Sequence, residues 1–360
     1  MKDVKNIYNA AIIGCGWIGE SKHVVGLMAN PDIRLVALCD IDVAKAERVN
    51  EQYHAGAKIY SDYKEMLKDE TIDIVHIAVP NPLHCQLTCD ALNAGKHVLC
   101  EKPMAMTKAE CELMIDTAKK NDRKLTVGYQ WRYRPETLYI KDYCAAGKLG
   151  NIYYAKAHGT RFRGVPAWGE YCTGKNGGGI LIDGAPHSLD LTLWAMDNYE
   201  PYSVKAYTGQ NMVSHQDGGP WGTWPAEAFN VEDTGMALIR MKNGAVIYLE
   251  AAWAMNMLQD DMKATFVGTE AGIDMFNKGG VRICGVENGK PYVMEPDMSV
   301  SPAPFAYRPL DPIFRESVEF VKAIREDAVP FVDPAQAMVV TQIIEGIYES
   351  AKTGKEYFFD

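Results

Sequence analysis

A glycine-rich turn near the start of the chain limits the possible folds more than any other feature. The sequence Gly14-Cys15-Gly16-Trp17-Ile18-Gly19 follows a short apolar run at 9–13 and precedes apolar residues at helical spacing over 17–30. In such a strand-turn-helix unit the first glycine permits the tight turn and the second lets a pyrophosphate approach the backbone. The third lets the helix pack closely on the strand. The pattern predicts a dinucleotide-binding unit, with amides at the helix start facing the phosphates.

The next predicted strand supports this interpretation. It covers Ile33–Cys39 and ends in Asp40, about twenty residues after the last glycine, where a carboxylate hydrogen-bonds the adenine ribose. Asp42 follows without an adjacent arginine, so a 2′-phosphate would meet two carboxylates and we expect NAD rather than NADP. The alternative is an ordinary glycine turn beside a solvated acidic corner. The cofactor-binding residues predicted in this part are Gly14, Gly16, Trp17, Ile18, Gly19, Asp40 and Ile41.

Length and composition exclude several classes of protein. The chain has 360 residues, enough for two domains, and a net charge of -10, which argues against nucleic acid as the main partner. Its 9 cysteines form no CxxC pair, a pattern that favours free thiols in a reducing compartment. No apolar stretch approaches the length of a membrane span. We therefore expect a cytoplasmic protein that binds neither nucleic acid nor membrane.

The order of predicted elements divides the chain near residue 130. In 1–129, strands and helices alternate, which predicts an α/β domain with a parallel, doubly wound Rossmann sheet. Thr107-Lys108-Ala109-Glu110 is a capping box that opens one of its helices. The other elements expected there are strands at 74–78, 97–100 and 124–129 and a helix at 84–94.

Strand-like runs dominate the predicted second domain, 130–360. Asn243-Gly244 between two alternating runs indicates a hairpin, so we expect an α+β domain with an antiparallel sheet. Strands are expected at 152–158, 203–207, 234–241, 245–253, 263–268 and 280–286, and helices at 136–146, 311–324 and 334–350. The glycine- and tryptophan-rich segment 217–224 is expected to be a loop.

Glu101-Lys102-Pro103 follows the predicted strand His97–Cys100. This places Lys102 at the carboxyl end of a parallel strand, where open α/β sheets present groups to ligands. A lysine there can reach a cofactor or a substrate hydroxyl. The alternative, a surface lysine that extends into solvent, fits the strand-end position less well.

A second group of candidate residues follows Gly177-Gly178-Gly179. Pro186 suits the first position of a helix, which puts His187 in the first turn. The helix dipole disfavours imidazolium there by roughly 0.3 to 1 kcal/mol, and a neutral imidazole is a competent general base. Asp183, four residues earlier, can meet the same substrate or orient the ring. Alternatively, both side chains serve the helix structurally. A zinc site with a cysteine lacks a second ligand pair of suitable spacing, so no metal is expected.

Together these motifs resemble those of the Gfo/Idh/MocA oxidoreductases, named after glucose-fructose oxidoreductase, inositol dehydrogenase and MocA. The resemblance rests on the glycine turn, Asp40, Pro80-Asn81-Pro82-Leu83-His84, Glu101-Lys102-Pro103, and Gly178-Gly179 with Asp183 and His187. It implies a Rossmann domain followed by a large, open, mainly antiparallel sheet that often forms oligomer contacts. It also implies that Lys102 hydrogen-bonds the reacting hydroxyl, with Asp183 and His187 as partners and His187 as the base. Further cofactor contacts implied are Pro80, Asn81, His84, Glu101, Lys102 and Gln130.

One departure from the family concerns the loop before His187. The family commonly has glycine two residues after the aspartate, whereas here Gly184 and Ala185 precede Pro186. The loop geometry is therefore expected to differ, although the acid and the histidine stay in register.

Two segments suggest the substrate. Gln130–Arg134 follows the last Rossmann strand, and 161–169 is a second segment rich in arginine and aromatic residues. Aromatic faces and guanidinium groups suit a polyol ring, although the same residues could pack a domain interface. The predicted substrate-binding residues are Lys102, Trp131, Arg132, Arg161, Arg163, Trp168, Asp183 and His187.

The substrate class follows from the resemblance. Within the family, segment 161–169 and the helix after Asp183 look most like oxidoreductases that oxidise the sugar 3-hydroxyl of plant glycosides. The alternatives are an inositol dehydrogenase, a glycosidase that cycles tightly held NAD between its redox states, and a non-catalytic NAD-binding regulator. A homo-oligomer, either dimer, tetramer or hexamer, is expected through the second-domain sheet.

Overall fold

The computed structural model describes residues 5–166, 171–216, 219–224, 226–258, 260–276, 280–298 and 312–360. The chain forms two compact units. The first unit is Met1–Tyr133 with Asp311–Met338, and the second is Arg134–Leu310 with Val339–Asp360. The segment Asp311–Met338 thus groups with the first unit, although it falls in the range 130–360 that the sequence analysis gave to the second domain.

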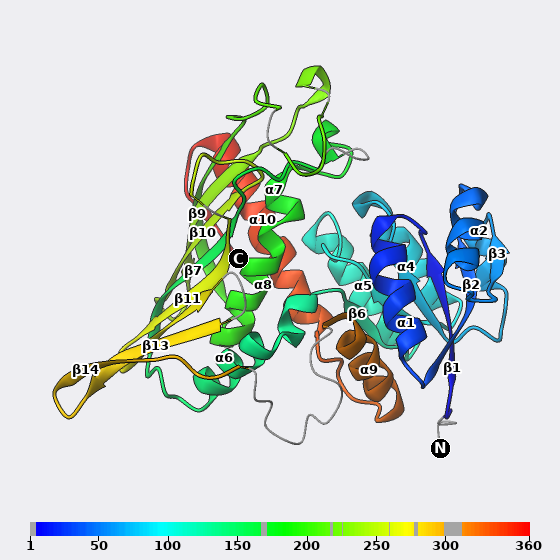
Figure 1. The fold of residues 1–360 in the computed structure, drawn as a ribbon, viewed down its shortest axis with the longest axis horizontal. Coiled ribbons are helices and arrows are strands. Elements are labelled where there is room, and N and C mark those ends of the chain that lie inside the picture. Colours follow the sequence, from blue (N-terminus) through cyan, green and yellow to red (C-terminus); the bar gives the residue numbers. More distant parts are fainter. Residues whose placement is uncertain are drawn as a thin grey trace. The chain divides into compact units, whose positions relative to one another are not determined.

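The first unit contains a six-stranded parallel sheet (Figure 1). Its order is β3-β2-β1-β4-β5-β6, and the order reverses between β1 and β4, where doubly wound folds bind their ligands. The strands are β1 (Tyr8–Ile13), β2 (Ile33–Cys39), β3 (Lys58–Tyr60), β4 (Ile74–Ile77), β5 (His97–Cys100) and β6 (Leu125–Val127). The helices are η1 (Gly19–Val24), α1 (Val25–Ala29), α2 (Val43–Gln52), α3 (Tyr63–Leu67), η2 (Asn81–Leu83), α4 (His84–Asn93), α5 (Lys108–Lys120), η3 (Gln130–Tyr133) and α9 (Pro312–Arg325). The predicted Rossmann sheet is confirmed.

Apolar strand residues build the core of this unit. Ile12, Leu38 and Ile74 from neighbouring strands are fully buried, and Phe320 of α9 packs into the same cluster. Burial on both faces explains why these strands are continuous apolar runs, as parallel strands usually are. The capping box at Thr107 is present at the start of α5, as predicted.

The second unit contains a nine-stranded sheet in the order β14-β13-β12-β11-β7-β10-β9-β8-β15. Every described neighbouring pair is antiparallel except β7 and β10, which run parallel. The strands are β7 (Ile152–Thr160), β8 (Pro201–Gly209), β9 (Thr234–Met241), β10 (Val246–Ala252), β11 (Asp261–Gly268), β12 (Ala271–Phe276), β13 (Gly280–Glu287), β14 (Lys290–Met294) and β15 (Tyr357–Phe358). The helices are α6 (Pro135–Ala145), η4 (Tyr171–Thr173), α7 (Ile180–Asp183), α8 (Ala185–Met196), η5 (Ala226–Ala228) and α10 (Pro334–Thr353), of which α10 begins in the first unit. The predicted, mainly antiparallel sheet is confirmed.

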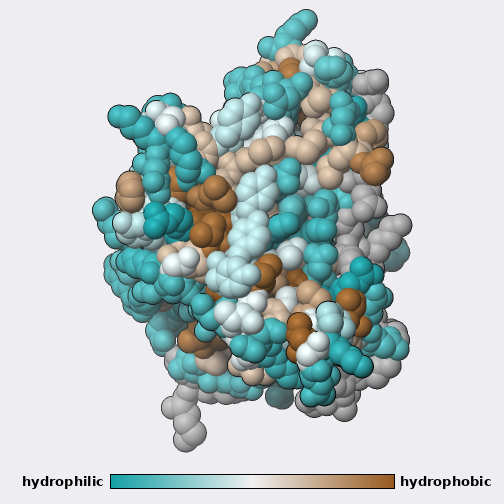
Figure 2. Space-filling model, turned by 90° about the vertical axis from the view of Figure 1, so that its left-hand side faces the viewer, coloured by the Kyte–Doolittle hydropathy of each residue, from teal (hydrophilic) through white to brown (hydrophobic). Residues whose placement is uncertain are grey.

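The two faces of this sheet differ. In β9, buried Ala237, Ile239 and Met241 alternate with more exposed residues, so one face is covered and the other is open. Helix α8 contacts β7, β10 and β11 on the covered side (Figure 1). Exposed apolar side chains of the strands include Tyr153 and Leu238. Figure 2 shows the face that is on the left in Figure 1, and hydrophobic (brown) and intermediate (pale) areas lie there among hydrophilic (teal) ones.

Most predicted elements have the predicted type, and the Asn243-Gly244 turn joins β9 to β10, with Gly244 at a φ of 91°. Strands β12, β14 and β15 were not predicted; β14 and β15 are short and lack alternation in burial, whereas β12 alternates and was overlooked. The predicted loop 217–224 lies partly outside the described residues, and Gly219–Trp224 has no helix or strand. All 9 cysteines are described, and each is a free thiol. Among the described residues, no helix has the length and apolar character needed to span a membrane.

Candidate active site

The three glycines of the turn have different surroundings. Gly14 has a φ of 99°, and a Cβ there would lie 2.2 Å from the Ala78 carbonyl oxygen. A Cβ on Gly19 would lie 1.9 Å from the Gly14 oxygen. A Cβ on Gly16, by contrast, would meet no atom within 4 Å. Gly14 and Gly19 are therefore required by the fold, while the open space at Gly16 fits a pyrophosphate that must approach the backbone.

Asp40 lies beside this turn at the end of β2. Its Oδ2 accepts a hydrogen bond from the Cys15 amide at 2.8 Å, and its Oδ1 accepts one from the Asp42 amide at 2.9 Å. The carboxylate is thus fixed next to the phosphate turn, where it can also accept from ribose hydroxyls. Trp17 and Ile41 are 67% and 96% exposed, so they lie at the surface of this edge. These residues fit a bound dinucleotide.

The predicted segment Pro80 to His84 follows β4. Pro80 precedes the short helix η2, which begins at Asn81. The His84 ring is buried, with Nδ1 2.7 Å from the Pro103 oxygen and Nε2 2.9 Å from the Val79 oxygen. Burial lowers the pKa of His84, and the carbonyl oxygens on its two ring nitrogens act in the opposite direction. His84 therefore ties the end of β4 to the backbone beside Lys102.

Glu101 belongs to a buried cluster of ionisable groups that the sequence analysis did not predict. We call Lys22, His23, His76, Glu101 and Glu316 the ion cluster; all five are at least nine-tenths buried. Lys22 Nζ lies 2.6 Å from Glu101 Oε1, and His23 Nε2 lies 3.1 Å from the same oxygen. Glu101 Oε2 accepts the Lys102 amide at 3.0 Å. The cluster thereby holds the backbone of the catalytic candidate Lys102.

The other members of the ion cluster come from distant elements. Lys22 Nζ lies 3.3 Å from Glu316 Oε2 on α9 and donates to Gln130 Oε1 at 3.3 Å. His23 Nδ1 is 2.9 Å from His76 Nδ1. Lys22 and His23 are carried inward by η1, which is a π-helical turn, a form frequently found at functional sites. A lysine and a histidine among the apolar residues of the predicted helix were the signal in the sequence.

Burial and charge act in opposite directions within the ion cluster. Burial raises the pKa of Glu101, but the Lys22 ammonium and the hydrogen bonds from Lys22 and His23 outweigh it, so the pKa lies well below its ordinary value. Burial raises the pKa of Glu316 to about 7, in spite of Lys22. Burial lowers the pKa of both histidines, His76 most strongly. One ammonium thus serves two carboxylates, of which only Glu316 titrates near neutral pH.

Asp183 and His187 lie one helical turn apart in the second unit. Asp183 is the last residue of α7, and His187 is the third residue of α8. Asp183 Oδ2 accepts a hydrogen bond from the indole Nε1 of Trp253 at 2.9 Å, and Arg161 Nη1 lies 3.9 Å from the same oxygen. Both side chains are partly exposed. An acid and an imidazole on adjacent turns can share one hydroxyl substrate.

The start of α8 differs in detail from the prediction. Pro186 is the second residue of the helix rather than the first, and Gly184 joins α7 to α8 in a helical conformation, with φ -97° and ψ -41°. The first turn of α8 is therefore not an isolated helix N-terminus. Because the preceding turn carries its own carbonyls, the predicted dipole effect on His187 is weakened.

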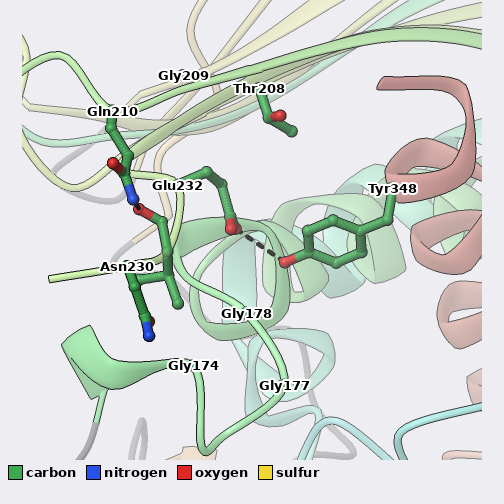
Figure 3. A pocket seen from close by; sticks show the side chains of 10 residues that line it. Gly174, Gly177, Gly178, Thr208, Gly209, Gln210, Asn230, Glu232 and Tyr348 are labelled. Carbon is green, nitrogen blue, oxygen red and sulfur yellow. Dashed lines mark hydrogen bonds between the residues drawn. The ribbon is translucent and has the colours of Figure 1, made fainter. Parts of the chain in front are cut away.

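A pocket at the other end of α7 contains a second unpredicted feature (Figure 3). It measures about 540 Å³ and is lined by Gly174, Gly177, Gly178, Thr208, Gly209, Gln210, Asn230, Val231, Glu232 and Tyr348. Figure 3 shows Glu232 and Tyr348 pointing toward each other, and the Tyr348 hydroxyl donates to Glu232 Oε1 at 2.8 Å. Glu232 also accepts the Gly179 and Leu181 amides, at 2.9 and 3.0 Å. Glu232 therefore anchors the start of the short helix that ends at Asp183.

Glycine is required in the loop at this pocket. A Cβ on Gly178 would lie 2.0 Å from the Tyr348 hydroxyl, and one on Gly179 would lie 1.9 Å from the Glu232 carbonyl oxygen. The glycine run Gly177–Gly179 in the sequence was the signal, but its partners lie more than 50 residues away.

The predicted substrate residues separate into two groups. In the second unit, the Arg161 guanidinium lies 5.1 Å from the Trp221 ring centre, and Arg163 Nη2 donates to Asn256 at 2.8 Å. In the first unit, Trp131 and Arg132 are buried, and Arg132 Nη1 donates to Gln336 at 2.6 Å. The full burial of Arg132 argues against its predicted contact with a substrate. Trp168 lies outside the described residues. Among the described residues, no group of His, Cys, Asp and Glu side chains could hold a metal ion.

The parallel sheet, the open position at Gly16 and the carboxylate of Asp40 define a Rossmann-type dinucleotide-binding protein with an attached α/β unit. Comparison with known families makes this specific. Residues 8–129 match the family described as "Oxidoreductase family, NAD-binding Rossmann fold", and residues 141–358 match its "C-terminal alpha/beta domain". The chain belongs to the Gfo/Idh/MocA family, and it is an NAD-dependent oxidoreductase.

Individual relatives agree with this assignment. The chain is 30% identical over 347 residues to D-glucoside 3-dehydrogenase of Escherichia coli, covering 96% of this chain and 95% of the relative. It is 32% identical over 202 residues to inositol 2-dehydrogenase of Salmonella paratyphi B, covering 55% and 57% of the two chains. A solved structure of levoglucosan dehydrogenase with NADH and L-sorbose superposes with a TM-score of 0.85 at 23% identity, covering 99% of this chain and 100% of the other, a likeness of fold alone.

Proposed function

We propose that this protein oxidises a secondary hydroxyl, at C3, of a sugar or glycoside. The single observation that carries the proposal is the pair Asp183 and His187 on adjacent helical turns. Asp183 accepts a hydrogen bond from Trp253 and lies close to Arg161. The similarity to a D-glucoside 3-dehydrogenase over nearly the whole chain supports the choice of substrate and carbon.

The chemistry divides among three side chains. Bound NAD⁺ supplies the acceptor for the hydride that leaves the carbinol carbon. His187 accepts the hydroxyl proton as general base. Lys102 donates a hydrogen bond to the same oxygen and stabilises the negative charge that develops on it. Asp183 orients the imidazole or the substrate hydroxyl. The product is the ketone, and the proton remains on His187 until it passes to solvent.

Arg161 and Trp221 support a sugar ring as substrate. The guanidinium lies over the indole, and Trp221 is 40% exposed. An aromatic face can cover the apolar face of a sugar, while guanidinium and carboxylate groups contact its hydroxyls. Arg163 and Trp168 remain candidates for the same role. An inositol is the second candidate substrate, supported by the similarity to inositol 2-dehydrogenase.

The test is a panel of free sugars, inositols, and alkyl and aryl glucosides, mixed with the protein and NAD⁺ while NADH absorbance is followed. We expect glucosides to reduce NAD⁺ and to give a 3-keto product by NMR. Reduction by inositols alone would identify the second candidate. Release of aglycone without net NADH would indicate internal redox cycling, and no reaction with any member would overturn the proposal.

The matched variant is His187→Ala. We expect its kcat to fall by about 10²- to 10⁴-fold, because general base catalysis contributes that much, while NAD⁺ affinity measured by fluorescence titration stays unchanged. The control is His215→Ala, an exposed histidine in the same unit. Loss of NAD⁺ binding in His187→Ala, or full activity, would contradict the role given to this residue.

The same family resemblance leads us to propose a homo-oligomer through the open face of the nine-stranded sheet. The exposed Tyr153, Leu238 and Val286 on its strands support this. Light scattering gives the mass of the assembly.

A further inference from the structure

The side chain of Trp253 stands out among the groups near Asp183. It follows β10 directly and is fully buried. An indole has one hydrogen-bond donor and no acceptor, and that donor goes to Asp183 Oδ2 at 2.9 Å. A buried polar group without a partner is costly, so the indole and the carboxylate hold each other in one geometry.

The backbone of Trp253 is fixed from two sides. Its amide donates to the Asp233 oxygen at 2.9 Å, and its carbonyl accepts the Gly164 amide at 2.7 Å. The ring packs edge-on against Phe229, with centroids 6.2 Å apart at 89°. Because the backbone and the ring are both constrained, the position of the N–H group is determined before any substrate arrives.

The start of α7, the helix that carries Asp183, is held by the residue next to Asp233. Glu232, adjacent to Asp233, accepts the first amides of α7, and Asp183 is the last residue of that helix. The Glu232 carboxylate thus fixes the helix that carries Asp183, and the neighbouring Asp233 carbonyl fixes the backbone of Trp253.

We propose that Trp253 is a positioning residue that fixes the orientation of the Asp183 carboxylate for the oxidation step. This inference rests on the proposed function, since it requires Asp183 to act on the substrate. Trp253 does not contact the reacting atoms in this scheme; it prevents the carboxylate from rotating away from them. Geometry of this kind matters because a small misplacement of a catalytic group lowers the rate strongly.

The test is Trp253→Phe, which keeps a buried aromatic ring and removes the N–H. We expect kcat to fall roughly 10- to 100-fold, the range for losing a hydrogen bond to a charged group, with NAD⁺ affinity unchanged. Trp224→Phe is the matched control: Trp224 is also buried, packs on the same Phe229, and donates its indole proton to the Val213 carbonyl at 2.9 Å. Trp224→Phe should keep nearly full activity at a similar thermal midpoint.

A double-mutant cycle separates the inference from the proposed function. If Trp253 acts through Asp183, then Trp253→Phe should change kcat less than about threefold in an Asp183→Ala background, in which the acceptor of the indole N–H is absent. An unchanged kcat in Asp183→Ala alone would refute the proposed role of Asp183. A severe loss in Asp183→Ala with full activity in Trp253→Phe would overturn only the positioning role. Equal losses of kcat in Trp253→Phe and Trp224→Phe, in proportion to the fall in their thermal midpoints, would also overturn the positioning role, because such losses would reflect lower stability alone.

A measurement on the intact indole covers the case in which Trp253→Phe does not fold. The chain has 7 tryptophans, so the indole N–H region of an NMR spectrum holds few signals. We expect the exchange of one slowly exchanging indole proton to accelerate in Asp183→Ala, which removes the acceptor of the Trp253 N–H, while the others, including that of Trp224, do not change. No change in any indole signal would contradict the hydrogen bond on which the inference depends.

Discussion

Each unit buries carboxylates beside a glycine-dependent loop, but the two units compensate them differently. In the first unit, Glu101 and Glu316 share the ammonium of Lys22. In the second, neutral groups donate to the Glu232 carboxylate: the Gly179 and Leu181 amides and the Tyr348 hydroxyl. Burial raises the pKa of Glu232 in spite of these donors, whereas Lys22 holds the pKa of Glu101 well below its ordinary value.

The two arrangements should respond differently to the removal of one partner of a buried carboxylate. The Lys22 ammonium outweighs burial at Glu101 but not at Glu316, and its removal would leave the Glu101 charge buried without its cation. A carboxylate held by several neutral donors loses only one bond when one donor is removed. The ion cluster should therefore be sensitive to single substitutions, and the Glu232 anchor should tolerate them.

The largest expected effect is that of Lys22→Met. It removes the ammonium from between Glu101 and Glu316, and breaking a buried pair in this way costs about 3–5 kcal/mol of unfolding free energy. Urea unfolding measures the loss. The control is Lys45→Met, because Lys45 is 3.6 Å from Asp42 in an exposed pair, which contributes about 1 kcal/mol or less. Equal stability of the two variants would show that the buried charges do not depend on Lys22.

The ion cluster also marks the limit of prediction from sequence. The strand containing Cys100, the glycine turn and Asp40 were predictable because each depends on a local pattern: period, spacing or turn chemistry. Lys22 meets Glu316 across nearly the whole chain, and no local pattern encodes such a contact. The grouping of α9 with the first unit escaped prediction for the same reason.

The candidate site was predictable in part. Asp183 and His187 lie on adjacent turns as their spacing requires, because a four-residue separation in a helix is a local property. The role of Gly178 and Gly179 was not predictable, since it depends on the approach of Tyr348 and Glu232 from other elements. The same holds for Trp253, whose partner Asp183 lies 70 positions earlier.

The second prediction concerns pH and uses Glu316→Gln. Burial raises the pKa of Glu316 from 4.5 to about 7, so between these values the folded protein binds a proton that the unfolded chain does not. Stability from this group is therefore lost as pH rises from 4.5 to 7. Glutamine cannot ionise, so the free energy of unfolding of the variant should rise relative to that of the wild type as pH increases across this window, by roughly 3 kcal/mol in total.

Thermal unfolding of both proteins from pH 4.5 to 8 is the measurement. The charged groups nearest Glu316 are Lys22 and, beyond it, Glu101, and neither titrates inside the window, because the pKa of Lys22 is raised by its two carboxylates against burial and that of Glu101 is depressed. His23 and His76 line the same small cavity and are present in both proteins, so their titration contributes to both curves and the difference between the curves reports on Glu316. A stability difference that does not vary with pH would mean that Glu316 is not protonated near neutral pH in the folded protein.

The smallest effect is expected for Tyr348→Phe, in the other arrangement. The hydroxyl is one donor to Glu232, and the Gly179 and Leu181 amides remain in its absence. We expect a loss of about 1 kcal/mol, the usual net value of one hydrogen bond, and a kcat within about threefold of the wild type, since α7 keeps its two amide contacts. Tyr153→Phe, a half-exposed tyrosine of β7, should show no change. A loss as large as that of Lys22→Met would mean that Glu232 depends on a single partner after all, and the contrast between paired charges and neutral donors would fail.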